Sequence, residues 1–123
     1  MRVLVCGDRK WSDANLINAR LDVLPRADLV IIEGEANGAD TFARLWAKAR
    51  HVPYLPFPAD WDQYHRAAGP IRNRTMLRDG RPDRVYAFHD HIESSRGTAD
   101  MVAAATKAGV PVTIFSHHGE EHR

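Results

Sequence analysis

The sequence predicts a single α/β domain with helices on both faces of a mostly parallel, five-stranded sheet. Short apolar runs bounded by turn residues alternate with longer segments in which apolar residues recur at helical spacing. This alternation is typical of βα units around a parallel sheet. The chain has 123 residues, enough for one ordinary domain and too few for two. We expect the domain to span residues 1–115 and the polar segment 116–123 to be a disordered tail.

The strand candidates are short and are apolar at successive positions, as in strands that are covered on both faces. Each connection between consecutive parallel strands is then a right-handed crossover through a helix. Five segments fit this description: Arg2 to Cys6, Leu29 to Ile32, Val52 to Phe57, Arg84 to Phe88 and Val110 to Phe115.

Four helices are expected between these strands, with limits marked by N-caps, by proline in a first turn, and by glycine or proline at the end. The first follows the N-cap candidates Ser12 and Asp13 and ends before Pro25. The second carries an apolar stripe from Ala39 to Ala47. The third begins near Pro70, and the fourth runs from Thr98 to Gly109.

The composition excludes several classes of partner. Lysine and arginine number 17 and aspartate and glutamate 16, which gives a net charge of +1, so no overall field attracts nucleic acid or an acidic membrane. The only cysteine, Cys6, lies in an apolar run, and we expect a buried thiol rather than a nucleophile. Neither a signal peptide nor a membrane span is visible, so we expect a cytoplasmic protein.

Function is expected at the carboxyl ends of the strands, where ligands of open parallel sheets bind. Glycines follow three strands there, at Gly7, Gly34 with Gly38, and Gly97. Glycine lets phosphate groups approach the backbone closely. The alternative is that these loops need glycine merely to turn, because Gly34-x-x-x-Gly38 matches neither the dinucleotide fingerprint nor the P-loop.

Cations at three helix starts point more directly to a ligand. Helix N-termini carry partial positive charge and repel cations unless an anion joins them. The cations are Arg9 and Lys10 before the first helix, Arg72 and Arg74 in the third, and Arg96 before the fourth. We expect Arg72 and Arg96 to contact a phosphate-bearing ligand, and Lys10 and Arg74 to extend into solvent.

Other side chains in these loops leave alternatives open. Trp11, Trp61 and Tyr64 could stack on a planar base or simply close the edge of the sheet. The histidines near residues 89–91 and 117–122 lack the spacing of a metal site, so no metal is expected. Carboxylates available for acid–base work are Asp8, Glu35, Asp40, Asp60 and Glu93, although the helix dipole already explains Asp40 in a first helical turn.

An ordered series of motifs covers nearly the whole chain apart from the tail. It comprises Gly7-Asp8-Arg9-x-Trp11-x-Asp13, Gly34-x-Ala36-x-Gly38-Ala39-Asp40-x-x-Ala43-x-x-Trp46-Ala47, Phe57-Pro58-Ala59-Asp60-Trp61, Ala67-Ala68-Gly69-Pro70-Ile71-Arg72-Asn73-x-x-Met76-Leu77 and Ser95-Arg96-Gly97-Thr98-Ala99-Asp100-Met101. With these motifs the chain resembles the YspA, cpYpsA-related SLOG family. The resemblance implies a Rossmann-like, three-layer SLOG domain that binds a nucleotide or a nucleotide-derived molecule such as NAD or ADP-ribose. It also implies a phage or bacterial source and is compatible with a homodimer or larger homo-oligomer.

Relatives of that superfamily suggest two further functions. The LOG phosphoribohydrolases, which cleave the N-glycosidic bond of nucleoside monophosphates, have an arginine similar to Arg72 and a glutamate where this chain has Met101. A hydrolase would need another carboxylate, for which Asp60, Glu93 and Asp100 are weak candidates. DNA binding in the manner of DprA is not expected, because the charge is near zero and no basic stripe is evident.

The expected ligand site therefore lies at the carboxyl edge of the sheet and requires neither a cofactor nor a metal. Its residues are Gly7, Asp8, Arg9, Trp11, Gly34, Gly38, Ala39, Asp40, Asp60, Arg72, Asn73, Ser95, Arg96, Gly97 and Thr98.

Overall fold

A computed structural model describes all residues from 1 to 123 and contains one mixed sheet of six strands in the order β3-β2-β1-β4-β5-β6. The first five strands are parallel, and β6 runs antiparallel to β5. The strands are β1 (Arg2–Gly7), β2 (Val30–Glu33), β3 (Tyr54–Pro56), β4 (Arg84–Phe88), β5 (Val112–Ser116) and β6 (Gly119–His122). The predicted α/β class is confirmed, but the predicted number of strands is wrong.

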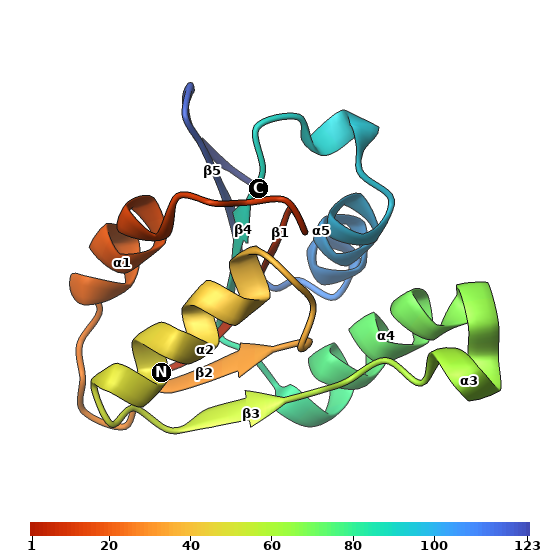
Figure 1. The fold of residues 1–123 in the computed structure, drawn as a ribbon, viewed down its shortest axis with the longest axis horizontal. Helices are drawn as coiled ribbons and strands as arrows, with labels where there is room; N and C mark the ends of the chain where they lie inside the picture. The colour runs from red at the N-terminus through yellow and green to blue at the C-terminus, as the bar shows by residue number, and fades with distance from the viewer.

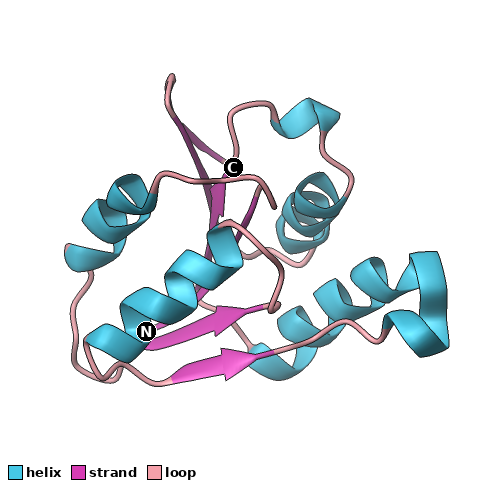
Figure 2. Ribbon diagram, in the orientation of Figure 1, coloured by secondary structure: helices cyan, strands magenta, loops and turns pink.

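Four long helices cover the sheet, with α1 and α2 on one face and α4 and α5 on the other (Figures 1 and 2). A one-turn helix, α3, lies beside the start of α4 in a segment where only a loop was expected. The helices are α1 (Ala14–Asp22), α2 (Ala39–Ala49), α3 (Trp61–Tyr64), α4 (Ala68–Gly80) and α5 (Gly97–Lys107), with 3-10 turns η1 (His65–Ala67) and η2 (Ile92–Ser94).

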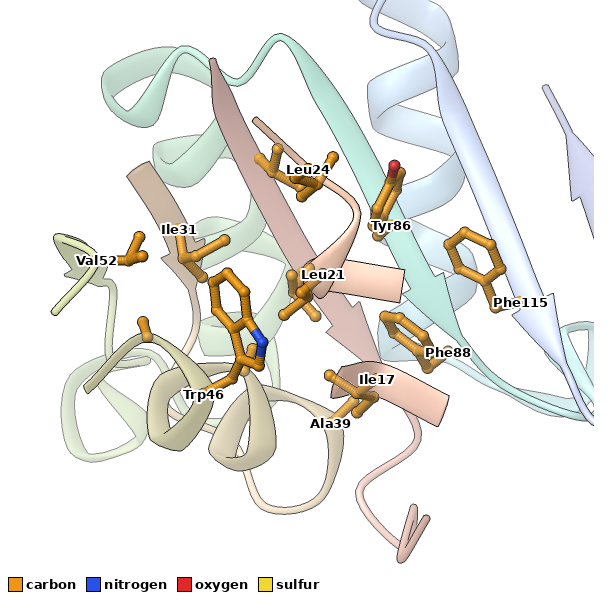
Figure 3. Packing of buried hydrophobic residues seen from close by; sticks show 14 of the residues in the cluster. Ile17, Leu21, Leu24, Ile31, Ala39, Trp46, Val52, Tyr86, Phe88 and Phe115 are labelled. Atoms are coloured by element: carbon orange, nitrogen blue, oxygen red, sulfur yellow. The ribbon is translucent and has the colours of Figure 1, made fainter. Parts of the chain in front are cut away.

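Strand β1 is buried on both faces of the sheet. Val3 and Val5 belong to the cluster that packs under α1 and α2 with Trp46 (Figure 3). Leu4 and Cys6 face the opposite cluster, with α4 and α5. Each fully buried side chain of this kind contributes about 1.5–3 kcal/mol to the free energy of unfolding. The run of consecutive apolar residues in the sequence thus reflects a strand covered by helices on both sides.

The C-terminal segment is ordered, in contrast to the predicted disordered tail. Strand β6 pairs with β5 from Ser116 opposite Gly119 to Thr113 opposite His122, and the backbones of Val112 and Arg123 exchange two further hydrogen bonds. All four residues of β6 are exposed. An edge strand gains its order from backbone hydrogen bonds and needs no apolar face, so its sequence carries no periodic signal.

His117, in the turn between β5 and β6, connects three parts of the chain. Its Nδ1 lies 2.8 Å from Oδ2 of Asp90, which follows β4, and its Nε2 lies 2.8 Å from Oδ2 of Asp13, the N-cap of α1. The imidazole also stacks on Trp11, with ring centroids 4.8 Å apart. Both carboxylates raise the pKa of His117, Asp90 more than Asp13, and the pKa values of both aspartates are lowered.

The loop after β1 crosses closely over the start of α2. Gly38 has φ +74°, and a Cβ atom there would collide with the Asp8 carbonyl oxygen and would lie 2.7 Å from the Arg9 carbonyl carbon. The backbone N–H of Ala39 donates to the Asp8 carbonyl oxygen. Only glycine allows this approach of two backbones, which brings the loops after β1 and β2 together.

We predict that the contacts of His117 stabilise the fold in a limited pH range. The raised pKa of His117 means that its contribution is complete below its ordinary pKa of 6.5 and is lost as the pH rises through the raised value. The contribution of the two aspartates is lost as the pH falls below their ordinary pKa of 3.8. His117→Phe, which keeps a ring against Trp11, should lower Tm by a few degrees at pH 6 and by much less at pH 9. His118→Phe on the same turn is the control, and an equal Tm difference at both pH values would contradict the prediction.

We also predict that Gly38→Ala destabilises the fold by about 1–3 kcal/mol, because alanine must adopt a positive φ and displace the backbone of Asp8 and Arg9. Chemical denaturation measures the change. The matched control is Gly97→Ala, where a new Cβ meets nothing within 4 Å. Equal stabilities of the two variants would show that the close approach at Gly38 is not needed.

Candidate functional site

A cleft of about 920 Å³ lies at the carboxyl edge of the sheet and is lined by 22 residues. After β1 the chain continues to β2, which pairs with one edge of β1, whereas β4 pairs with the opposite edge of β1. The loops after β1 and β4 therefore diverge, and in open α/β sheets this reversal of strand order is where ligands bind. The volume lies within the range of about 300–1,000 Å³ for small-molecule sites.

The cleft brings together ten of the fifteen residues that the sequence predicted for the ligand site. They are Gly7, Asp8, Arg9, Asp40, Arg72, Asn73, Ser95, Arg96, Gly97 and Thr98. They come from the last residue of β1 and from the loops and helices that follow β1, β2, β3 and β4. The topology thus assembles residues that are up to 91 positions apart in the sequence, from 7 to 98.

The other five predicted residues do not line the cleft. Trp11 is buried against Phe88 and His117. Gly38 and Ala39 lie beneath the loop after β1, where their backbones contact Asp8.

The remaining two have structural contacts next to the cleft. Gly34 accepts a hydrogen bond from Arg72 through its carbonyl oxygen. Asp60 is the N-cap of α3, and its Oδ1 accepts from the backbone N–H of Gln63 at 3.1 Å.

Several lining residues were not in the predicted ligand site. Lys10, which was expected in solvent, is exposed and also lines the cleft. Arg66, His89 and His91 line the cleft as well. Arg66 lies in the long connection after β3, and the length of this connection was the only sequence feature that pointed to a functional segment there. The buried thiol of Cys6 lies at the floor, and burial raises its pKa, as expected for an unreactive cysteine.

Five cations line the cleft, and none has a carboxylate oxygen within 4 Å. They are Arg9, Lys10, Arg66, Arg72 and Arg96. By contrast, six arginines outside the cleft are in ion pairs: Arg26, Arg44, Arg50, Arg74, Arg78 and Arg123. Only two carboxylates, those of Asp8 and Asp40, line the cleft. The cleft therefore carries local positive charge although the chain as a whole is nearly neutral.

Arg72 is held in place by neighbours on both sides. Its Nη1 donates to the Gly34 carbonyl oxygen at 2.6 Å, and its Nε donates to Oδ1 of Asn73 at 3.0 Å. The amide nitrogen of Asn73 in turn donates to Oδ2 of Asp100 at 2.9 Å. Burial lowers the pKa of Arg72, and the nearby Asp40 opposes this shift. The guanidinium is thus oriented by the loop after β2 and by α5 before any ligand binds.

Asp40 has a larger role than the interaction with the helix dipole that the sequence suggested. Its Oδ2 accepts backbone hydrogen bonds from Gly34 at 3.0 Å and from Ala36 at 3.2 Å, so the carboxylate organises the loop after β2. The side chain is 4% exposed, and burial raises its pKa to about 6. Asp40 is therefore a carboxyl group at the wall of the cleft that titrates near neutral pH.

Glu33, at the end of β2, is a buried carboxylate that sequence reasoning missed. Its Oε2 accepts from the backbone N–H of Glu35, and its Oε1 has no partner. Burial raises its pKa to about 7. The sequence feature that could have indicated its burial is that an acidic residue directly continues a buried apolar strand. Glu33 does not line the cleft.

The three weak candidates for a catalytic carboxylate lie outside the cleft. Asp100 is ion-paired with Arg74 at 2.7 Å, Asp60 caps α3, and Glu93 lines a separate, smaller hollow beside β6. Met101, at the position of the glutamate in LOG enzymes, lies in the wall of the cleft with 1% of its surface exposed. The histidines do not join other potential ligands into a group of three or more that could hold a metal ion.

No helix of this chain has both the length and the apolar character needed to cross a membrane.

Comparisons with known proteins agree with the resemblance seen in the sequence. The chain is 38% identical over 122 residues to the Gene 61 protein of Mycobacterium phage D29, and the match covers 93% of this chain and 95% of the phage protein. A family model described as "YspA, cpYpsA-related SLOG family" matches residues 1–64. This match includes β1, β2 and the loops that follow both strands. The chain belongs to the YspA, cpYpsA-related SLOG family.

Proposed function

We propose that the protein binds a nucleotide or a nucleotide-derived small molecule, such as a nucleoside phosphate, NAD or ADP-ribose, in the cleft at the carboxyl edge of the sheet. In this role it acts as a sensor or a sequestering protein. The observation that supports the proposal best is the set of five unpaired cations, Arg9, Lys10, Arg66, Arg72 and Arg96, around one cleft. Their mutual repulsion favours an anionic occupant with more than one negative charge.

The phosphate groups are expected between Arg72 and the start of α5. Arg72 is already oriented by Gly34 and Asn73, and an oriented guanidinium loses little freedom when it binds a phosphate in bidentate fashion. The Ser95 hydroxyl accepts the backbone N–H of Thr98 in the first turn of α5 at 3.0 Å, whereas the N–H of Gly97 has no acceptor in the chain, and both Gly97 and Thr98 line the cleft. Free backbone N–H groups at a helix start add to the attraction for phosphate.

The first prediction about the cleft is that Arg96→Ala weakens binding of ADP-ribose roughly tenfold or more, because a charge-assisted hydrogen bond contributes about 1.5–3 kcal/mol. Arg78→Ala is the matched control, since Arg78 also belongs to a helix but is exposed and paired with Asp79 outside the cleft. Isothermal titration and thermal shift with nucleoside monophosphates, NAD and ADP-ribose identify the ligand class.

Arg72→Ala should weaken the same binding at least as much as Arg96→Ala, because it removes the guanidinium that the fold orients. Circular dichroism shows whether the variant keeps its fold without the hydrogen bond to Gly34. If a folded Arg72→Ala variant binds as tightly as the wild type, the phosphate site is misplaced. Failure of every anionic nucleotide of the panel to bind would remove the proposed function itself.

A second candidate function is hydrolysis of the N-glycosidic bond of a bound nucleotide, in which water replaces the base on the sugar. Asp40 favours it, because this buried carboxyl group lines the cleft and has a pKa raised to about 6, which suits a general acid or base near neutral pH. Met101 opposes it, because it leaves the position of the LOG glutamate without a carboxylate.

Release of free base separates the two functions. If the protein is a hydrolase, Asp40→Asn should lower the rate of base release by about 10²–10⁴-fold while nucleotide binding persists, and the wild-type rate should change with pH around 6. Chromatography of the reaction products measures the rate. Binding without any base release by the wild type would remove the hydrolase and leave the binding function.

A further inference from the structure

Trp61, at the start of α3, is the only one of the three tryptophans that lies open at the cleft. It lines the cleft and is 46% exposed, whereas Trp11 and Trp46 are buried. The indole N–H groups of Trp11 and Trp46 donate to Asp13 and Asp22, respectively. The indole N–H of Trp61 has no such acceptor within the chain.

The fold holds this exposed ring in one place. Asp60 caps α3 through the backbone N–H of Gln63 and thereby sets the first residue of the helix, Trp61. The indole packs next to Gly69 of α4, where an added Cβ would be 3.5 Å from the ring carbon Cη2. Figure 1 shows α3 lying against the start of α4, the helix that also carries Arg72. The ring and the oriented guanidinium thus belong to one packed unit.

One face of the ring is covered by a cation that has no other fixed partner. The guanidinium carbon of Arg9 lies 5.3 Å from the centre of the Trp61 ring, and Arg9 is exposed and has no ion pair. An exposed cation–π contact is weak. A planar base can therefore take the place of the guanidinium on the ring without breaking an ion pair, and Arg9 becomes free to approach the phosphates.

We propose that Trp61 is the base-stacking residue of the cleft and makes it select ligands that carry a nucleobase over bare sugar phosphates. This inference rests on the proposed function, since it assigns the base end of a ligand whose phosphates bind near Arg72 and Arg96. Stacking on an aromatic side chain recognises the π-face of any base. The predicted selectivity is therefore for the presence of a base, with little distinction between adenine and other bases.

The test compares adenosine 5′-monophosphate with ribose 5-phosphate, which lacks the base. For the wild type we expect the monophosphate to bind roughly tenfold more tightly or better. Trp61→Leu keeps an apolar contact with Gly69 but has no π-face, and it should bring the two affinities within about threefold of each other. Trp61→Phe should keep most of the selectivity. Tyr64→Leu is the matched control, because Tyr64 is an exposed aromatic residue of the same helix that does not line the cleft.

Two further readouts separate stacking from a loss of packing. Adenosine 5′-monophosphate should quench the fluorescence of the exposed Trp61 in the wild type, and Trp61→Phe should lose this quenching while it still binds in calorimetry. Arg9→Ala should weaken the monophosphate more than ribose 5-phosphate, because only a ligand with a base displaces Arg9 from the ring toward the phosphate.

The outcomes distinguish the inference from the function on which it rests. If the wild type binds both ligands equally, or if Trp61→Leu retains the full selectivity, Trp61 is not the stacking residue, although the cleft remains a nucleotide site. If neither ligand binds and NAD and ADP-ribose also fail, the proposed function and the inference are both wrong.

Discussion

The position of β1 in the middle of the sheet, with helices packed on both of its faces, is the constraint on which the other features depend. Val3, Leu4 and Val5 are each fully buried, and they alternate between the two helical layers. With β2 on one side and β4 on the other, the loops that leave β1 and β4 turn in opposite directions. The cleft is the space between them, so the burial of a few apolar residues determines where a ligand can bind.

The loops at this edge hold one another in place through buried polar contacts. Asp40 accepts the backbone N–H groups of Gly34 and Ala36, and the carbonyl oxygen of the same Gly34 accepts from Arg72. The buried carboxylate of Asp40 and the half-buried guanidinium of Arg72 are each costly to remove from water. Here each is satisfied by the backbone of the loop between them. The loop after β2 therefore joins an acid on α2 to a cation on α4 and orders both before a ligand arrives.

Sequence reasoning was most successful where apolar pattern and turn chemistry determine the structure. The first five strands and the four long helices follow from these signals, and ten of the fifteen residues predicted for the ligand site line one cleft. It failed where order comes from pairing with a neighbouring strand: β6 is exposed throughout and has no apolar residue, and only its pairing with β5 makes it a strand. Two of the five predicted residues that do not line the cleft differ from the expectation for a similar reason. Trp11 and Ala39 share segments with true lining residues but point into the core, and the direction of a side chain within a loop has no periodic signal.

The near-neutral charge of the chain and the positive charge of its cleft have one explanation. Most arginines outside the cleft are neutralised by a carboxylate on the same surface, as Arg74 is by Asp100 on the neighbouring helix. Inside the cleft Arg72 has Asp40 nearby as its counter-charge, whereas Arg9, Lys10, Arg66 and Arg96 have no ion-pair partner. Because unpaired cations near one another repel, this arrangement is less stable than one with paired charges. Its persistence in the fold is accounted for most simply when the missing negative charge arrives with a ligand.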